Sequence, residues 1–413
     1  MSPLAAAGIS ASSSACRHAW EQRQLGEVAE ICRGLTYSPS ALSDSKDGVR
    51  VLRSSNIDDG IFTIHDDDVF VSRSCINVGY IQRNDILMTA ANGSNALVGK
   101  HAIIPAVSVE RMAPGGFMYR LHSEQPTFLN SYFSSPSFNR FLSSHVLGGD
   151  GSIGNLSRND LAAWFLSIPN DNEQRRIGEF FSTLDSLIAD AERQKALLRQ
   201  KKQAYLQLMF PCEGETQPRL RFSGFNGQWQ QRQLGEVAEI VGGGTPDSSN
   251  ADYWDGDIDW YIPSEIGESR IAQASTRKIT REGLNHSSAR LLPAGSILFT
   301  SRASIGLMAF ISRPSATNQG FQSLIPNGEV DPDFLYALGP RISRYAKKHA
   351  AGSTFIEISG SSLAKAPLRI PKLPEQRLIG QLFSTFDKII SAAEQQIESL
   401  QMAKAAYLQR MFV

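Results

Sequence analysis

The sequence is poor in cysteine and contains no long apolar run. Its 413 residues include four cysteines, Cys16, Cys32, Cys75 and Cys212, which lie far apart and form no CxxC pair. This spacing argues against a disulfide framework and against the usual zinc motifs, and it is typical of a reducing compartment. No apolar segment reaches the ~20 residues that cross a bilayer. We therefore expect a cytoplasmic protein with no contact with a membrane.

The first residues of the chain are rich in serine and alanine. Residues 1–19 (MSPLAAAGISASSSACRHA) lack the basic start and the apolar core of a secretory signal. We predict that they form a disordered leader.

Motifs for catalysis and nucleotide binding are also missing. Residues 93–101 (GSNALVGKH) have the wrong spacing for a phosphate-binding loop, and residues 242–245 (GGGT) lack the rest of a dinucleotide fingerprint. Residues 331–334 (DPDF) are one residue away from the Asp-Pro-Pro-Phe/Tyr signature of amino-methyltransferases, but Asp331 as an N-cap and Pro332 at the first helical position explain them. The seven histidines show no metal-ligand spacing. We predict a chain that is not an enzyme and binds no metal or cofactor itself.

The formal charge of the chain is balanced, with 41 basic and 41 acidic residues. This balance argues against a uniformly basic protein that wraps nucleic acid. Local basic patches remain compatible with DNA binding, because the local potential matters more than the total.

The chain is an internal repeat. Residues 172–210 align without a gap with residues 374–412, and residues 20–31 (WEQRQLGEVAEI) return almost unchanged as residues 229–240 (WQQRQLGEVAEI). Each half thus begins with the short repeated segment and ends with the long one. Self-similarity at such a long period indicates two tandem copies of one architecture.

Apolar side chains recur in both long segments at alternating steps of three and four residues, which predicts helices with a coiled-coil seam. The predicted seam consists of Ile177, Phe181, Leu184, Ile188, Leu198 and Tyr205 in the first copy, and Ile379, Phe383, Phe386, Ile390, Leu400 and Tyr407 in the second. Each helix could pack on its own domain, or the two could pair with each other. Equal lengths and matching lysines, Lys202 and Lys404, favour pairing.

Large apolar residues flank this seam. We expect Phe180, Leu187, Leu208 and Leu382 to be exposed, where they would contact a partner or pack against the globular domains.

Between the repeated segments lie strand-like runs separated by Gly, Pro, Asn and Ser clusters, followed by helical stretches at residues 127–144 and 332–350. The predicted fold class is α+β. It comprises two mixed domains separated by two long antiparallel helices, with approximate two-fold symmetry inside one chain. The predicted boundaries are 1–19 for the leader, 20–170 for the first domain, 171–210 for the first helix, 211–228 for a linker, 229–372 for the second domain and 373–413 for the second helix.

Two unlike domains held apart by a rod suit a duplex DNA with two half-sites. A helix of this length measures about 58 Å, and two-fold readers place their half-sites ~34–36 Å apart. Candidate base contacts are Asn92, Asn95 and Arg302, because Asn reads adenine and Arg reads guanine in the major groove. Candidate phosphate contacts are Arg341, Arg344, Lys347 and Lys348. Each of these could instead be an ordinary surface residue.

Several motifs in this sequence are typical of one family. They are RQLGEVAEI, present twice, residues 242–261 (GGGTPDSSNADYWDGDIDWY), residues 317–322 (TNQGFQ), residues 218–229 (PRLRFSGFNGQW) and the repeated Ile-Pro that precedes the Glu-Gln-Arg helix. On these residues the chain resembles the specificity (S) subunit of Type I restriction–modification systems, from Trp20 to the C-terminus. It departs from that family at the serine-rich leader, which replaces a PRLRF-like opening.

The resemblance implies a fold and a set of partners. It implies two target recognition domains separated by two conserved helices, in a non-catalytic subunit that binds double-stranded DNA and joins two methyltransferase (M) subunits. With two restriction (R) subunits the complex becomes a nuclease. The M subunits would bring S-adenosylmethionine, and the R subunits ATP and Mg²⁺.

Two other classes of function stay open. The chain could be a coiled-coil adaptor that bridges two protein partners without touching DNA, which a salt-dependent DNA-binding assay would separate from the first hypothesis. It could also be an enzyme, which would require this chain alone to bind S-adenosylmethionine or ATP.

Overall fold

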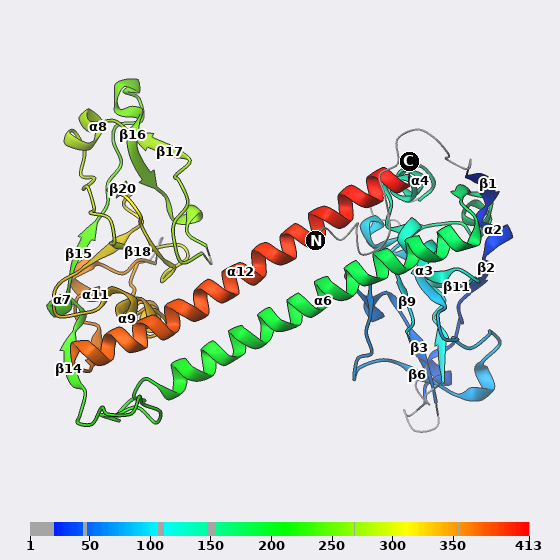
Figure 1. Cartoon of the computed structure of the whole chain (residues 1–413), viewed down its shortest axis with the longest axis horizontal. Helices are drawn as coiled ribbons and strands as arrows, with labels where there is room; N and C mark the ends of the chain where they lie inside the picture. The colour runs from blue at the N-terminus through cyan, green and yellow to red at the C-terminus, as the bar shows by residue number, and fades with distance from the viewer. Residues whose placement is uncertain are drawn as a thin grey trace. The chain divides into compact units, whose positions relative to one another are not determined.

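The computed structural model describes residues 20–43, 48–105, 111–146, 153–267, 269–352 and 356–412. The predicted leader lies outside the described residues. The chain divides into two compact units: the first takes in Met1–Asp190 and Ile397–Val413, and the second Ala191–Gln396. Two long helices, α6 (Asp171–Leu208) and α12 (Leu373–Met411), contribute to both units (Figure 1). We call the part of each unit outside α6 and α12 its globule.

The first globule is built around two small sheets. Its strands are β1 (Glu21–Gln24), β2 (Glu30–Arg33), β3 (Val49–Leu52), β4 (Ile57–Asp58), β5 (Ile61–Phe62), β6 (Phe70–Val71), β7 (Ile86–Thr89), β8 (Ala91–Asn92), β9 (His101–Ile103), β10 (Met112–Pro114), β11 (Met118–His122), β12 (Gly154–Asn155) and β13 (Phe165–Ile168). One sheet has the order β2-β11-β7-β9 and the other β10-β3-β6, with β10 parallel to β3. Two-stranded pairs join β1 to β13, β8 to β12 and β4 to β5.

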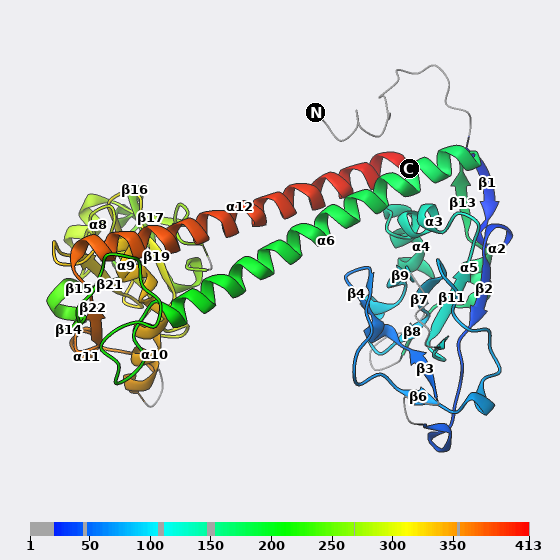
Figure 2. The ribbon, with the colours of Figure 1, turned by 60° about the horizontal axis from the view of Figure 1, so that its bottom comes forward.

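Short helices surround these sheets. They are α2 (Leu25–Val28), α3 (Pro126–Phe133), α4 (Pro136–His145) and α5 (Arg158–Ala163), with the single turns η1 (Pro39–Ala41), η2 (Ser54–Asn56), η3 (Arg73–Cys75) and η4 (Asn95–Leu97). The sequence predicted one helical stretch at residues 127–144. The structure has two helices there, because Pro136 starts a new one with Ser135 as its cap. Figures 1 and 2 show α3 lying between β9 and α6.

The second globule repeats this plan. Its elements are β14 (Gln230–Gln233), α7 (Leu234–Val237), β15 (Ala238–Gly242), η5 (Ala251–Tyr253), β16 (Trp254–Tyr261), η6 (Pro263–Glu265), β17 (Arg277–Ile279), α8 (Arg281–Asn285), β18 (Ile297–Phe299), β19 (Met308–Phe310), β20 (Ser315–Thr317), β21 (Gln322–Pro326), α9 (Pro332–Ala337), α10 (Gly339–His349), α11 (Gly360–Leu363) and β22 (Pro367–Ile370). The four-stranded sheet has the order β15-β21-β18-β19 and the three-stranded one β17-β16-β20. Strand β16 runs parallel to β20, as β3 does to β10, and β14 pairs with β22, as β1 does with β13. The predicted N-cap at Asp331 is confirmed, since its side chain accepts a hydrogen bond from the Phe334 amide at 2.9 Å.

The two long helices pair antiparallel within each unit. In the first unit the Lys404 ammonium lies 2.5 Å from the Asp185 carboxylate, and the rings of Phe181 and Phe412 stack. As the residue number falls along α6, it therefore rises along α12. This confirms the pairing that the matching lysines favoured.

The second unit shows the same direction and the equivalent contacts. Lys202 lies 2.5 Å from Asp387, and Phe210 packs on Phe383. In the repeat, Asp387 is equivalent to Asp185, and Lys202 is equivalent to Lys404. The two phenylalanines of the second unit likewise match those of the first. The ion pairs and the ring pairs are thus duplicated together with the sequence.

Helix α6 and helix α12 each pack closely on a short helix of the globule at a glycine. A Cβ on Gly178 would lie 2.3 Å from Thr127 Oγ1, and one on Gly380 would lie 2.5 Å from Asp331 Oδ1. These are the start of α3 and the cap of α9. Glycine at both repeat positions therefore allows the globule to approach its long helix.

The predicted seam residues differ in burial. Ile177, Phe181, Leu184, Ile379, Phe383 and Ile390 are buried, whereas Ile188, Leu198, Phe386, Leu400 and Tyr407 are half-buried. Tyr205 remains 37% exposed, although its ring packs 5.7 Å from that of Phe386. Five of the buried members belong to the globule cores, Ile177, Phe181 and Leu184 to the first and Ile379 and Phe383 to the second, whereas Tyr205 belongs to neither core.

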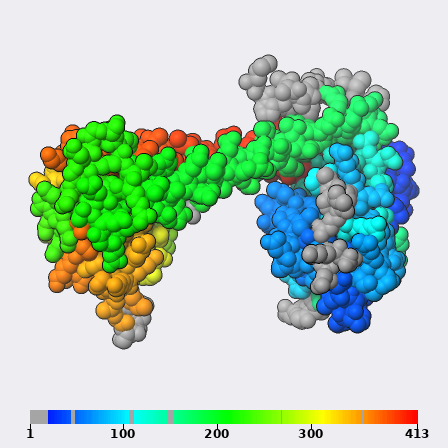
Figure 3. Space-filling model, turned by 90° about the horizontal axis from the view of Figure 1, so that it is seen from below, coloured from blue at the N-terminus to red at the C-terminus, as the bar shows by residue number. Residues whose placement is uncertain are grey.

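The flanking residues were predicted to be exposed, and for Phe180 this was wrong. Phe180 is only 6% exposed because its ring packs against Tyr407 at 5.1 Å. Leu382 is half-buried, and Leu187 and Leu208 are exposed as predicted. Figure 3, seen from below, shows the middle of α6, in green, with no other part of the chain in front of it. Within the described residues, no helix combines the length and the apolar character needed to span a membrane.

Candidate nucleic-acid interface

Four loops of the second globule meet at one place, although they come from distant parts of the sequence. They are residues 243–250, 262–265, 300–306 and 317–320, and we call this surface the four-loop face of the second unit. The Gly244 amide donates to the Thr317 carbonyl at 2.9 Å, and the Ser301 amide donates to the Gly320 carbonyl at 2.8 Å. The Asn318 amide donates to the Tyr261 carbonyl at 2.9 Å. These backbone bonds fix the loops relative to one another.

The first globule has a matching four-loop face, made of residues 34–36, 53–56, 89–99 and 114–117. The Leu35 amide donates to the Pro114 carbonyl at 2.7 Å, and the Gly115 amide donates to the Leu52 carbonyl at 2.8 Å. The Thr89 hydroxyl donates to Ser54 Oγ at 3.2 Å. The backbone frame is therefore repeated, while the side chains that it carries differ.

A glycine at the first loop makes this convergence possible in both units. A Cβ on Gly34 would lie 1.9 Å from the Gly115 carbonyl oxygen, and one on Gly243 would lie 2.0 Å from the Asn318 carbonyl oxygen. Such distances exclude any side chain. The two glycines hold the first loop against the fourth.

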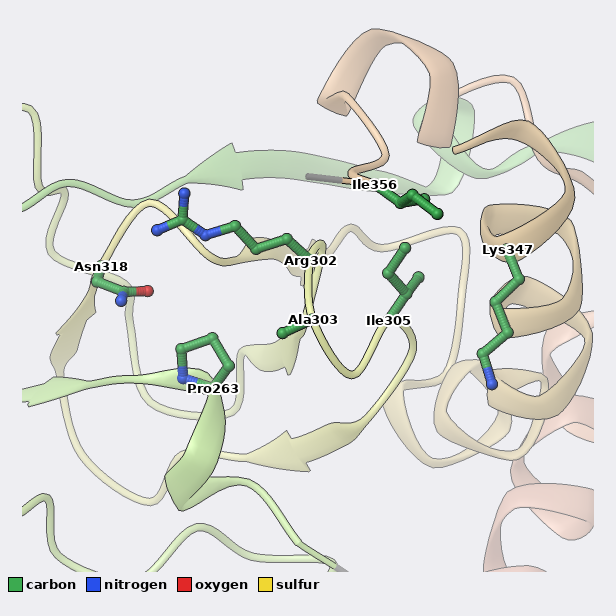
Figure 4. Close-up of a pocket in the computed structure, with 7 residues that line it drawn as sticks. All are labelled: Pro263, Arg302, Ala303, Ile305, Asn318, Lys347 and Ile356. Carbon is green, nitrogen blue, oxygen red and sulfur yellow. The ribbon is translucent and has the colours of Figure 1, made fainter. Parts of the chain in front are cut away.

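A pocket of about 820 Å³ opens on the four-loop face of the second unit. It is lined by Pro263, Arg302, Ala303, Ile305, Asn318, Lys347 and Ile356. In Figure 4 the Arg302 side chain extends toward Asn318, and Lys347 reaches the opposite side of the pocket from α10. The described lining residues include two cations and no carboxylate. This is a suitable environment for an anionic or electronegative ligand.

The loop that carries Arg302 is shaped by its own hydrogen bonds. The Thr300 hydroxyl accepts from the Leu307 amide at 2.9 Å and donates to the Ser304 carbonyl at 2.5 Å. Ala303 adopts a positive φ of 59° and Gly306 one of 95°. A non-glycine residue at positive φ is held there by its surroundings. The loop is thus preorganised and presents Arg302 outward.

The DNA contacts predicted for the second unit do not all lie at the same pocket. Arg302 and Lys347 line the same pocket, which the sequence did not show. Lys348 is exposed on α10, and Arg344, also exposed, lines a separate pocket of about 330 Å³ beside the linker. Arg302 and Lys347 therefore remain the strongest candidates in the second unit.

Arg341 requires a correction. Its guanidinium donates to the carbonyl oxygens of Pro211 at 2.5 Å and Phe210 at 3.1 Å, and burial lowers its pKa below the usual value. These bonds satisfy two carbonyls of the segment that follows the end of α6 at Leu208. The predicted phosphate contact of Arg341 is replaced by a structural role.

The two asparagines of the first unit lie on its four-loop face. Asn92 ends β8 and is half-buried, and its Oδ1 accepts from the Ser94 amide at 3.0 Å. Asn95 begins η4 and is exposed. Their loop contains no lysine or arginine between residues 89 and 99, whereas the equivalent loop of the second face carries Arg302.

Three polar residues of the second face, Thr245, Asn318 and Gln319, were not among the contacts predicted from the sequence. Thr245 donates to Gln319 Oε1 at 2.5 Å, and Asn318 Oδ1 accepts from the Gly320 amide at 2.8 Å. Both segments stood in motifs that carried the family resemblance, TNQGFQ and GGGT. Their place in these motifs was the one feature of the sequence that could have identified them as candidate contacts. Within the described residues, no three His, Cys, Asp or Glu side chains gather as a metal site would require.

Comparison with known proteins identifies the family. The Type I restriction modification DNA specificity domain matches the chain twice, at residues 18–200 and 226–402. The chain therefore belongs to this family. The sequence-based resemblance is confirmed, and the alternative of an adaptor that does not bind DNA is not favoured.

Individual relatives agree with this assignment. The MjaIX specificity subunit of Methanocaldococcus jannaschii is 34% identical over 189 residues, which are 45% of this chain and 44% of that subunit. The EcoR124I/EcoR124II specificity subunit of Escherichia coli is 30% identical over 175 residues, or 40% of this chain and 43% of that subunit. Each of these alignments thus spans less than half of the relative's length.

A solved structure shares the fold. The S subunit of the Type-I restriction-modification system from M. genitalium matches over 96% of this chain and 97% of that chain, with a TM-score of 0.65 and 14% identity. The predicted fold class, two mixed α+β domains with two long antiparallel helices, is confirmed.

Proposed function

We propose that this chain is the DNA-specificity subunit of a Type I restriction–modification complex and that each four-loop face reads one half of a bipartite DNA site. The observation that carries this proposal is the repeated backbone frame with different side chains on it. A common frame would place both faces equivalently on duplex DNA, and the different side chains would read different half-sites. The subunit itself performs no catalysis in this proposal.

The partners follow from the same proposal. Two methyltransferase subunits bind the paired helices and supply S-adenosylmethionine, and two restriction subunits supply ATP and Mg²⁺ within a cytoplasmic complex. The helices set the spacer between the half-sites. Leu187 and Ile389, which occupy equivalent repeat positions and are 47% and 46% exposed, support docking of two identical partners on the helices.

Exchange of one globule tests the proposal. Residues 25–164 would be replaced by the corresponding residues of another member of the family, so that the β1–β13 ladder, which begins at Gln24 and Phe165, is kept. We expect methylation mapping in cells to show a new sequence in one half of the target and the old sequence in the other. A change in both halves would contradict the division of labour between the units.

Two single substitutions in the second unit should have different consequences. Arg302→Ala is expected to relax specificity at one base pair, by about 1–3 kcal/mol of discrimination, because a bidentate contact to guanine would be lost. Lys347→Ala is expected to weaken binding to all sequences alike and to reduce the salt dependence by about one phosphate contact. Competition binding of the assembled complex to a library of single-base variants measures both effects.

Arg290→Ala is the control for these variants, since Arg290 is exposed and outside the pocket. It should change neither specificity nor salt dependence. If Arg302→Ala relaxed base specificity in the half-site read by the first unit, the assignment of Arg302 to a base contact of the second unit would be wrong. If Lys347→Ala altered a base preference, its assignment to a phosphate contact would be wrong.

A further inference from the structure

Arg270 joins the second globule to the long helices. It lies between η6 and β17, and its backbone is tied to β19: the Phe310 amide donates to the Arg270 carbonyl at 2.8 Å, and the Ala272 amide donates to the Phe310 carbonyl at 2.9 Å. Its side chain is only 13% exposed. The arginine is therefore anchored in the globule.

The guanidinium of Arg270 makes ion pairs with two other elements. It donates to Asp387 of α12 at 2.7 Å and to Asp333 of α9. It also lies over the rings of Phe310 and Tyr336, 4.8 Å and 4.3 Å from their centroids. Burial raises the pKa of Tyr336 to about 12, so this ring stays neutral and its hydroxyl donates to the Met308 carbonyl. Two carboxylates and two π faces thus fix the cation in one position.

The Asp387 carboxylate connects three elements. It accepts from Arg270 through one oxygen and from Lys202 of α6 through the other. A pocket of about 970 Å³, lined among others by Arg199, Arg270 and Asp387, lies at this junction. The ion pairs of Arg270 and Lys202 with Asp387 therefore line a pocket at the junction.

The equivalent junction of the first unit has a different composition. Asp185 and Lys404 occupy the repeat positions of Asp387 and Lys202, and among the described residues Lys404 is the ion-pair partner found for Asp185. Thr127 stands at the position of Asp333. The nearby His101 is half-buried, and desolvation lowers its pKa. Among the described residues of the first globule, no cation pairs with Asp185 as Arg270 pairs with Asp387.

We infer that Arg270 is a positioning residue that fixes the angle between the second globule and the helix pair, and that it thereby sets how strictly the complex selects the spacer length of its DNA site. This inference rests on the proposed function. The contacts of α9 and the segment before it with α12, through Gln376, Gly380 and Phe383, all lie near the start of that helix, and a globule held only near one end of a helix can rock. The Arg270–Asp387 bond lies one helical turn further along α12 than Phe383 and supplies a second point.

The test uses the assembled methyltransferase complex and duplexes whose spacers are one base pair shorter than, equal to, or one base pair longer than the natural one. For wild type and for Arg290→Met, methylation should be confined to the natural spacer. Arg270→Met keeps an apolar stem beneath the rings but removes both ion pairs. It is expected to raise the relative rate on the altered spacers by about tenfold, comparable to the effect of one mismatched base pair. Arg270→Lys retains the positive charge, and its relative rate on the altered spacers should lie between those of wild type and Arg270→Met.

Asp333→Asn provides a second variant at a more exposed position, in case Arg270→Met does not assemble. It should also raise the relative methylation rate on the altered spacers. Wild-type spacer selection by both assembled variants would overturn the inference and leave the proposed function intact. A wild-type complex that methylates all spacers equally would overturn the proposed function instead.

Discussion

Replacing Arg221 by alanine is expected to destabilise the second unit by about 3–5 kcal/mol, the usual cost of removing one partner from a buried ion pair. Arg221 holds Glu375 through two parallel bonds, Nε to Oε1 at 2.6 Å and Nη2 to Oε2 at 2.8 Å. The Glu375 side chain is 1% exposed, and the Arg221 side chain 15%. The hydrogen bond to Glu375 raises the pKa of Arg221, so the cation is present at any accessible pH. Without it, a carboxylate would remain buried and unpaired.

Arg219 offers a matched control two residues away. Its ion pair with Glu215 is exposed, so Arg219→Ala should cost less than about 1 kcal/mol. The double variant Arg221→Ala/Glu375→Gln should recover part of the loss, because the buried charge is gone. Denaturant unfolding, with amide exchange to localise the change, measures all three variants. A loss for Arg221→Ala no larger than that for Arg219→Ala would show that Glu375 is not dependent on its partner.

The equivalent glutamate of the first unit has a different hydrogen-bond partner. Glu173, the repeat equivalent of Glu375, accepts from Trp20 Nε1 at 3.3 Å. In the second unit Arg221 takes the carboxylate, and the equivalent indole nitrogen of Trp229 has no hydrogen-bond partner among the described residues. A tryptophan therefore binds the glutamate in the first unit, and an arginine binds it in the second.

The repeat made the architecture predictable from the sequence. Helical periodicity, the cap at Asp331 and the matching lysines are local or duplicated signals, and the structure confirms all three. Among the strand-like runs of the sequence, residues 48–54 and 296–300 contain β3 and β18, and residues 85–88 overlap β7, which ends one residue later at Thr89. Strand edges were less accurate, because the pattern of apolar residues does not mark where a ladder ends.

The site was less predictable, because its parts meet only in the fold. Arg341 sits in a basic helix, and the basic pattern predicted a phosphate contact. Its partners, the Phe210 and Pro211 carbonyls, lie 131 and 130 positions away, so no local pattern could reveal them. The same holds for the pocket, where Pro263, Arg302 and Lys347 come from three separate loops and helices. Side-chain type identified Arg302 as a candidate, but only the fold showed that Lys347 lies across from it.

The aromatic side chains at the ends of the two long helices are expected to stabilise each unit separately. Phe412 is 1% exposed and lies 4.7 Å from Tyr132 and 5.8 Å from Phe128 and Phe181, ring centre to ring centre. Phe210, its repeat equivalent, is 2% exposed and lies 5.5 Å from Phe334 and 5.8 Å from Phe383. Each ring fills the space between the globule and the long helices of its own unit.

Phe412→Ala and Phe210→Ala should each cost about 3–5 kcal/mol, the range for deleting a buried phenylalanine. The loss should be local, so amide exchange should accelerate in α3 after Phe412→Ala and in α9 after Phe210→Ala. Met402→Ala, at a position that is 61% exposed on α12, is the control and should cost less than about 1 kcal/mol. Equal acceleration in both units by either phenylalanine variant would contradict this result, because it would mean that the two globules unfold as one body. Local effects, by contrast, would show that each globule is held to the helix pair by its own aromatic contacts, and therefore that one recognition domain can change without loosening the other.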